Sequence, residues 1–180
     1  MLPRIRPRVF AISIAALAVS AVIAPAQRAP YTSPPAKSTA TINGKEFSVD
    51  YYSPGMHGRK IFGELVPFGE LWGTGANVAT GFTTPFDIRI GDLKLPKGAY
   101  SIWTLPQEKE WTLVLNKQHG QFHLDYDQSE DFGRTKMTLR ALSEPVENLK
   151  IEVKADGAKR GRLVVSWETT EASIPFEILP

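Results

Sequence analysis

Apolar and polar side chains alternate along residues 82–90 (FTTPFDIRI), and this period of two limits the fold more than any other feature of the chain. Side chains two positions apart lie on the same face of a strand, so Phe82 and Ile90 fall on an apolar face and Arg89 on a polar one. Pro85 has no N–H to donate to a ladder, so we expect an edge strand or a bulge here.

The same alternation recurs along nearly the whole chain after residue 40, and no stretch has a convincing helical period. We expect strands at residues 41–52, 82–90, 99–105, 111–115, 134–142, 148–154, 162–167 and 173–179, with residues 91–95 as a plain connection. Turn signals separate them, among them Asn43-Gly44 and Asp156-Gly157. About eight to ten strands at this spacing predict an all-β fold, an antiparallel β-sandwich with little helix.

Residues 1–26 have the features of a cleaved export signal. Arginines precede an apolar run at residues 9–23, which is short for a membrane span, and an Ala-Pro-Ala sequence at residues 24–26 supplies the small residues of a cleavage site. An uncleaved anchor is the alternative interpretation. We expect export to the periplasm or out of the cell, with no membrane span once the signal is removed.

The chain contains no cysteine, which excludes disulfides, lipoprotein anchoring, zinc–thiolate sites and a cysteine nucleophile. Removal of the signal leaves 18 of the 21 basic residues against 19 acidic ones, so the net charge is about −1. Charge therefore gives no reason to expect nucleic acid as a partner. Residues 27–40 contain prolines and no periodicity, which predicts a flexible tether, and residues 41–180 are expected to form one β-sandwich domain.

Residues 58–80 (GRKIFGELVPFGELWGTGANVAT) break the alternation. They combine glycines and large aromatics with two copies of Phe-Gly-Glu-Leu, which start at Phe62 and Phe68. Connections longer than about 12–15 residues are uncommon in compact domains and are usually functional or disordered. This segment is too apolar for disorder, so we expect a long ordered loop that is rich in glycine and aromatic residues.

This loop also carries a resemblance to a known family. Residues 58–80 are similar to the pattern GR.IFG.LVPYG..WRTGAN.AT, residues 95–101 to LPAGTYSL, residues 111–116 to WTVIFN, and residues 126–131 to YDP..D. These patterns are typical of a family of exported bacterial domains, domain of unknown function twenty-nine eleven, and the resemblance extends from about Tyr31 to the C-terminus. It implies a secreted, β-rich domain and no particular reaction.

Two positions depart from the family pattern. Phe68 stands where the pattern has tyrosine, and Gly73 stands where it has arginine. If a phenol hydroxyl or a guanidinium contacts a ligand in relatives, this chain has lost both groups.

Two hypotheses compete for residues 58–80. In the first, the glycines supply the positive φ angles of turns, and Phe62, Phe68 and Trp72 cover an open end of the sandwich. In the second, the loop is a shallow site for a glycan or small polar ligand, with Trp72 as a stacking platform. The side chains that would contact such a ligand are Arg59, Glu64, Phe68, Glu70, Trp72, Thr74, Asn77 and Thr80.

A hydrolase is an alternative, because Glu64 and Glu70 lie in the same loop. A glycosidase with paired carboxylates needs its two carboxyl groups about 5–10 Å apart, and a tight loop can place them so. Exposed loop glutamates, however, are usually just solvated.

Residues 119–131 (HGQFHLDYDQSED) suggest a weak metal site. His123 and Asp125 would share one face if residues 121–126 form a strand, and His119 lies close in sequence. The simpler interpretation is the polar face of an exposed strand and its turn.

No motif for a serine hydrolase, a phosphate loop or a cofactor is present, and we expect no cofactor. The sequence favours an exported, non-enzymatic binding module of the cell envelope for a glycan or small polar ligand. The alternatives are a hydrolase, and a structural or protein-interaction module whose partner is another envelope protein.

Overall fold

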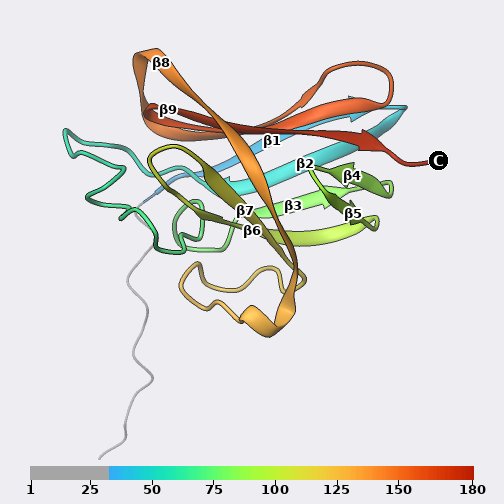
Figure 1. Cartoon of the computed structure of the whole chain (residues 1–180), viewed down its shortest axis with the longest axis horizontal. Coiled ribbons are helices and arrows are strands. Elements are labelled where there is room, and N and C mark those ends of the chain that lie inside the picture. Colours follow the sequence, from blue (N-terminus) through green and yellow to red (C-terminus); the bar gives the residue numbers. More distant parts are fainter. Residues whose placement is uncertain (1–32) are drawn as a thin grey trace, which may run out of the picture. The chain divides into compact units, whose positions relative to one another are not determined.

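The computed structural model describes residues 33–180, so the predicted export signal at residues 1–26 lies outside the described residues. Nine strands and one short 3-10 helix, η1 (Gln128–Glu130), make up this part of the chain (Figure 1). The strands are β1 (Pro35–Ile42), β2 (Lys45–Tyr52), β3 (Gly81–Thr84), β4 (Ile88–Ile90), β5 (Leu93–Leu95), β6 (Gly98–Leu105), β7 (Trp111–Asn116), β8 (Asp131–Ala155) and β9 (Arg160–Ile178). All of them pair antiparallel, which confirms the predicted all-β fold.

The strands pair in the order β1-β2-β3-β6-β7-β8-β9-β4-β5. Strand β8 belongs to two layers, because residues 131–137 pair with β7 and residues 138–155 pair mainly with β9. Figure 1 shows this long orange strand crossing from one layer to the other. The end of β8 comes back over β1, where the Ser38 hydroxyl accepts a hydrogen bond from the Val153 N–H at 3.1 Å. The two layers therefore face each other as a sandwich.

The apolar core fills the space between these layers, and its residues come from alternating strand positions. On β7, Trp111, Leu113 and Leu115 point into this core. Val114 points to the opposite face, where it packs with Trp103 in a second, smaller cluster. Both faces of β6 and β7 are therefore covered, as expected for the apolar sequences of central strands.

The prediction of one strand at residues 82–90 is wrong. The chain forms β3, which pairs with β6, and then β4, which pairs with β9. Pro85 lies at the break, where the Thr84 hydroxyl donates a hydrogen bond to the Phe86 carbonyl at 2.7 Å. The alternation continues through the break because both short strands turn their apolar side chains toward the same core.

Three other boundaries also differ from the predictions. Residues 35–40, which were expected in the tether, belong to β1 and pair with β2. Residues 91–95, expected to be a plain connection, contain β5. The four C-terminal strands are two long ones, because β8 and β9 continue through irregular pairing between Ala141 and Lys150. The turn at Asn43-Gly44 is confirmed, since both residues have positive φ angles between β1 and β2.

Two long connections contact each other beside the sandwich. The 53–80 loop joins β2 to β3, and the 117–130 loop joins β7 to β8. A bridge between Val78 and Phe122 links the two loops, and the His123 N–H donates to the Asn77 carbonyl at 2.8 Å. In Figure 1 they are the teal-to-green and the yellow-to-orange irregular segments. Within residues 33–180, no helix is both long and apolar enough to cross a membrane.

Candidate binding cavity

The inward face of the 53–80 loop is part of the sandwich core. Ile61, Phe62 and Val66 are all buried. The Trp72 N–H donates to the Thr104 carbonyl at 2.8 Å, and the Thr104 N–H donates back to the Trp72 carbonyl at 2.9 Å. Trp72 therefore forms an isolated antiparallel bridge with Thr104 of β6. The expectation that the loop is ordered is confirmed.

Four aromatic rings close this end of the core. The Phe62 ring lies edge-on to Trp111, with centroids 4.8 Å apart, and also contacts Trp72 and Trp167. The Trp72 indole stacks on Trp167 at 5.8 Å with an interplanar angle of 20°. Because Trp167 lies against one face of Trp72, a ligand has access only to the rest of the half-buried indole.

A cavity of about 380 Å³ lies between the 53–80 and 117–130 loops, and we call it the loop cavity. It is lined by Ser33, Pro54, Arg59, Leu65, Val66, Pro67, Glu70, Leu71, Trp72, Gly73, Gly75, Ala76, His123 and Leu124. Most of this lining is apolar, with Arg59, Glu70 and His123 as the titratable groups. Sites for small organic ligands have this composition and a comparable volume.

Arg59 is held in place at the edge of the loop cavity. Its Nε donates to the Met56 carbonyl at 2.9 Å, and one Nη donates to the Gly55 carbonyl at 2.7 Å. Glu70 is exposed, and within residues 33–180 its carboxylate has neither a hydrogen bond nor an ion pair. The cavity thus offers one fixed cation and one free carboxylate to a ligand.

His123 reaches the loop cavity because residue 73 is glycine. A Cβ atom at Gly73 would lie 2.5 Å from the His123 carbonyl oxygen, closer than real Cβ atoms approach. Burial lowers the pKa of His123 below its ordinary value, and the nearby Asp125 carboxylate opposes this shift. The imidazole is therefore biased toward its neutral form, with a buried Nδ1 that has no hydrogen-bond partner among the described residues.

A polar cluster fixes the 117–130 loop at the start of β8. The Tyr126 hydroxyl donates to the Asp131 carboxylate, with oxygen–oxygen distances of 2.7 and 2.8 Å, and Arg134 binds the same carboxylate at 2.9 Å. Asn116 donates to Asp131 from β7 at 3.1 Å. Burial, followed by the hydrogen bond and the charge of Asp131, raises the pKa of Tyr126 to about 12. The residues of the YDP..D-like motif are therefore structural, and they hold the loop that carries His123.

The structure brings together only part of the predicted ligand site. Arg59, Glu70 and Trp72 line the loop cavity. Phe68 is 41% exposed but lines a different cavity of about 240 Å³, beside Phe62 and Trp111. The hypothesis of a site for a glycan or small polar ligand therefore keeps only these three of the predicted contacts.

The remaining predicted contacts point elsewhere. Glu64 is exposed and is not part of the lining of the loop cavity. Thr74 is fully buried, with its hydroxyl between the Trp72 carbonyl and Thr104. Thr80 is also buried and donates to the Thr74 carbonyl. Asn77 has a positive φ of 63°, and its buried Nδ2 has no partner among residues 33–180.

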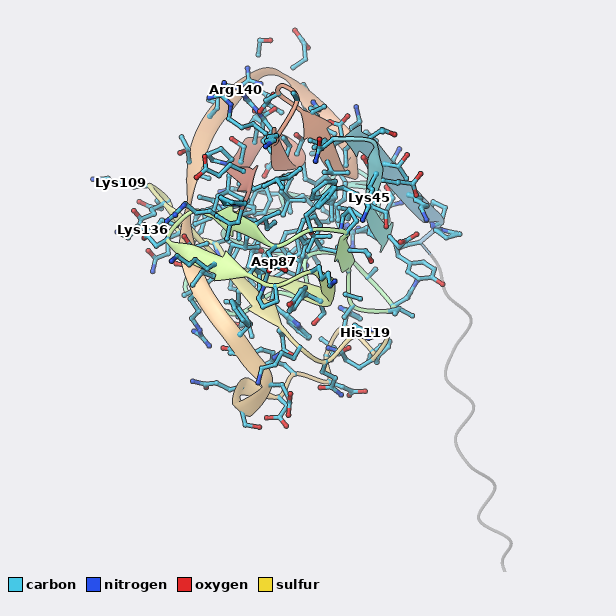
Figure 2. All side chains as sticks on the ribbon, turned by 90° about the vertical axis from the view of Figure 1, so that its right-hand side faces the viewer. Lys45, Asp87, Lys109, His119, Lys136 and Arg140 are labelled. Atoms are coloured by element: carbon cyan, nitrogen blue, oxygen red, sulfur yellow. The ribbon has the colours of Figure 1, made fainter. Side chains whose placement is uncertain are left out.

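The predicted metal ligands do not form a metal site. Within residues 33–180, no group of three or more His, Cys, Asp or Glu side chains could hold a metal ion. His119 lines a separate cavity over β2, β3 and β6. In Figure 2 it lies on the side of the view opposite Lys109 and Lys136. The premise was also wrong, because residues 121–126 form turns and a single bridge instead of a strand, so His123 and Asp125 do not share a strand face.

Residues 33–176 match the family described as protein of unknown function (DUF2911). The chain belongs to this family. The resemblance drawn from the motifs is thereby confirmed, and the DUF2911 region contains both loops and the entire lining of the loop cavity. No curated protein matches the chain. No solved structure matches it either.

Sequence reasoning missed the apolar wall of the loop cavity. Leu65, Leu71 and Leu124 were not among the predicted ligand contacts. Leu124 is nevertheless 72% exposed, and it is the one aliphatic side chain in the polar run of residues 119–131. Single exposed apolar residues are common on protein surfaces, so the sequence carried no clear signal that Leu124 lines a cavity.

Proposed function

We propose that this DUF2911 domain is a non-enzymatic binding module of the cell envelope, and that its ligand enters the loop cavity. The observation that carries the proposal is the combination of an apolar wall with a fixed guanidinium and a free carboxylate in one cavity of about 380 Å³. Polar groups at a few positions of an apolar cavity orient a ligand, while burial of its apolar part supplies most of the affinity.

The same geometry argues against the hydrolase alternative. Of the two candidate carboxylates, Glu70 lines the loop cavity and Glu64 does not. A paired-carboxylate mechanism needs both groups on opposite sides of one scissile bond. Binding, by contrast, requires only groups that are already in the lining.

A protein-interaction module is the second candidate, and a specific observation favours it. The exposed large hydrophobic side chains among residues 33–180 are Leu65, Phe68 and Leu124, which are 46%, 41% and 72% exposed. All three lie on the two loops that form the cavity, and two of them are in its lining. Exposed apolar groups gathered in this way are typical of surfaces that another molecule covers.

A thermal-shift screen of the full chain tests the proposed function. The panel contains envelope sugars, small carboxylates, small amines and neutral apolar compounds. A ligand present at 100 times its Kd stabilises the folded state by about 2.7 kcal/mol, which moves the melting temperature visibly. We expect at least one compound with an apolar part to raise it.

Matched variants show whether a hit binds in the loop cavity. Leu65→Ser and Leu124→Ser change exposed side chains of the lining, and Phe68→Ser changes an exposed side chain of the same loop that lines a different cavity. The shift should disappear in the first two variants and persist in the third. A flat panel would contradict the small-ligand function and favour the protein-interaction module.

A further inference from the structure

A second cavity, of about 560 Å³, adjoins the loop cavity, and the two share Ser33, Pro54 and Arg59 in their linings. The rest of the second lining is mostly polar and consists of Pro34, Ser53, Gly55, His57 and Asn148. The two cavities therefore adjoin at these residues, and we call them together the groove, with the loop cavity as its apolar part and the second cavity as its polar part. Arg59 stands at the junction.

The charge of Arg59 is not compensated by the protein. Its guanidinium is held by the carbonyls of Met56 and Gly55, which are neutral acceptors, and among residues 33–180 no carboxylate forms an ion pair with it. An arginine fixed in this way keeps N–H donors free on its planar fork, and that fork matches the two oxygens of a carboxylate. The junction is thus prepared for an anionic group.

The polar part of the groove is lined by a histidine and an asparagine and by no acidic residue. A Cβ atom at Gly55 would lie 2.8 Å from His57 Nε2 and 3.0 Å from Asn148 Oδ1, so the imidazole and the amide lie directly over this glycine. Glu147, which precedes Asn148 in the sequence, accepts a hydrogen bond from the His57 backbone N–H at 2.9 Å. The carboxylate in the apolar part is Glu70, which disfavours a second negative charge there.

We propose that the groove binds an amphiphilic monocarboxylate. Its carboxylate lies at Arg59, and its hydrocarbon part lies against Leu65, Leu71 and Trp72 in the loop cavity. This assignment rests on the proposed function, because it names the ligand class of the same site. One negative charge suits the groove, since Arg59 attracts it and Glu70 opposes another one farther along.

The test is calorimetric titration of the full chain with three probes of equal chain length: octanoate, octanol and octyltrimethylammonium. We expect octanoate to bind about tenfold or more tightly than octanol, as one charge-assisted contact supplies, and the cation to bind most weakly. Arg59→Gln should weaken octanoate binding by about tenfold and leave octanol unchanged. The matched control is Lys60→Gln, which removes a neighbouring exposed cation that lines neither cavity.

The outcomes separate this inference from the proposed function. Equal affinity for octanoate and octanol, or equal losses in Arg59→Gln and Lys60→Gln, would overturn the carboxylate assignment while leaving apolar binding in the cavity intact. Arg59→Lys keeps the charge and should retain part of the preference for octanoate, which covers the case in which the glutamine variant does not fold. If none of the three octyl probes binds but compounds of the thermal-shift panel do, this inference alone is overturned. If neither the octyl probes nor the panel compounds bind, the proposed function is overturned as well.

Discussion

The two faces of the 53–80 loop differ sharply although their residues alternate within a few positions. Ile61 and Phe62 are 0% and 5% exposed, whereas Leu65 and Phe68 are 46% and 41% exposed. The inward face packs into the aromatic end of the core, and the outward face contributes to cavities at the surface. The comparison shows how one loop can be ordered by the core and still expose apolar side chains at the surface.

The largest expected effect follows from removing an inward aromatic ring. Phe62→Ala deletes a ring that contacts three tryptophans, and truncation of a buried aromatic side chain costs about 3–5 kcal/mol of unfolding free energy. Phe68→Ala is the outward counterpart and should cost about 1 kcal/mol. Urea denaturation of both variants measures the difference. Equal losses would mean that the two faces are not energetically distinct.

A smaller effect is expected from adding one methyl group where the loops meet. Gly73→Ala places a Cβ atom against the His123 backbone, and such overpacking costs about 1–3 kcal/mol. It should also weaken ligand binding, because His123 and Leu124 must move. Gly81→Ala is the control, since its Cβ atom would meet nothing closer than 3.9 Å, and it should be nearly neutral in the same denaturation experiment. Unchanged stability in Gly73→Ala would contradict the close contact between the loops.

The polar anchor of the 117–130 loop predicts an alkaline pH dependence. The folded-state pKa of Tyr126 is raised from 10.0 to about 12, so its contribution to stability is fully present below pH 10 and is lost as the pH rises toward 12. Tyr126→Phe should cost about 1 kcal/mol at neutral pH through the lost hydrogen bond. It should also lose less stability than the unmodified chain between pH 10 and 12. Parallel alkaline profiles of the two proteins would count against this role.

The smallest effect concerns His123. Burial lowers its folded-state pKa below the ordinary value of 6.5, so the unfolded chain takes up the proton first and stability falls as the pH drops below 6.5. His123→Asn removes this dependence. Melting temperatures at mildly acidic pH should therefore decline less steeply in the variant. A steeper decline would mean that the protonated imidazole is stabilised in the fold.

The fold was predictable from the sequence because alternation reports directly on which side chains face the core. Pro85 is instructive, since its effect on the ladder was foreseen but the change of partner strand from β6 to β9 was not. A sequence period shows that a residue faces a core and does not show which neighbour it pairs with. The same limit explains the merging of four expected strands into β8 and β9.

The loop cavity was only partly predictable for a different reason. Its two walls come from loops that are some fifty residues apart, and they meet because Gly73 lets the His123 backbone approach. The aromatic residue that looked most like a ligand platform, Trp72, is shared between the core and the cavity. Residue types alone do not tell an inward aromatic from an outward one in a loop without periodicity.

An NMR titration of the isotope-labelled full chain with octanoate tests most directly the claim that an amphiphilic carboxylate binds in the loop cavity. The account predicts amide shift changes at residues 59–73 and 123–124, with the amide of Phe62 changing least because its side chain is buried in the core and does not line the loop cavity. Changes centred on β2, β3 and β6 around His119, where another cavity lies, or no saturable change in either loop, would contradict it.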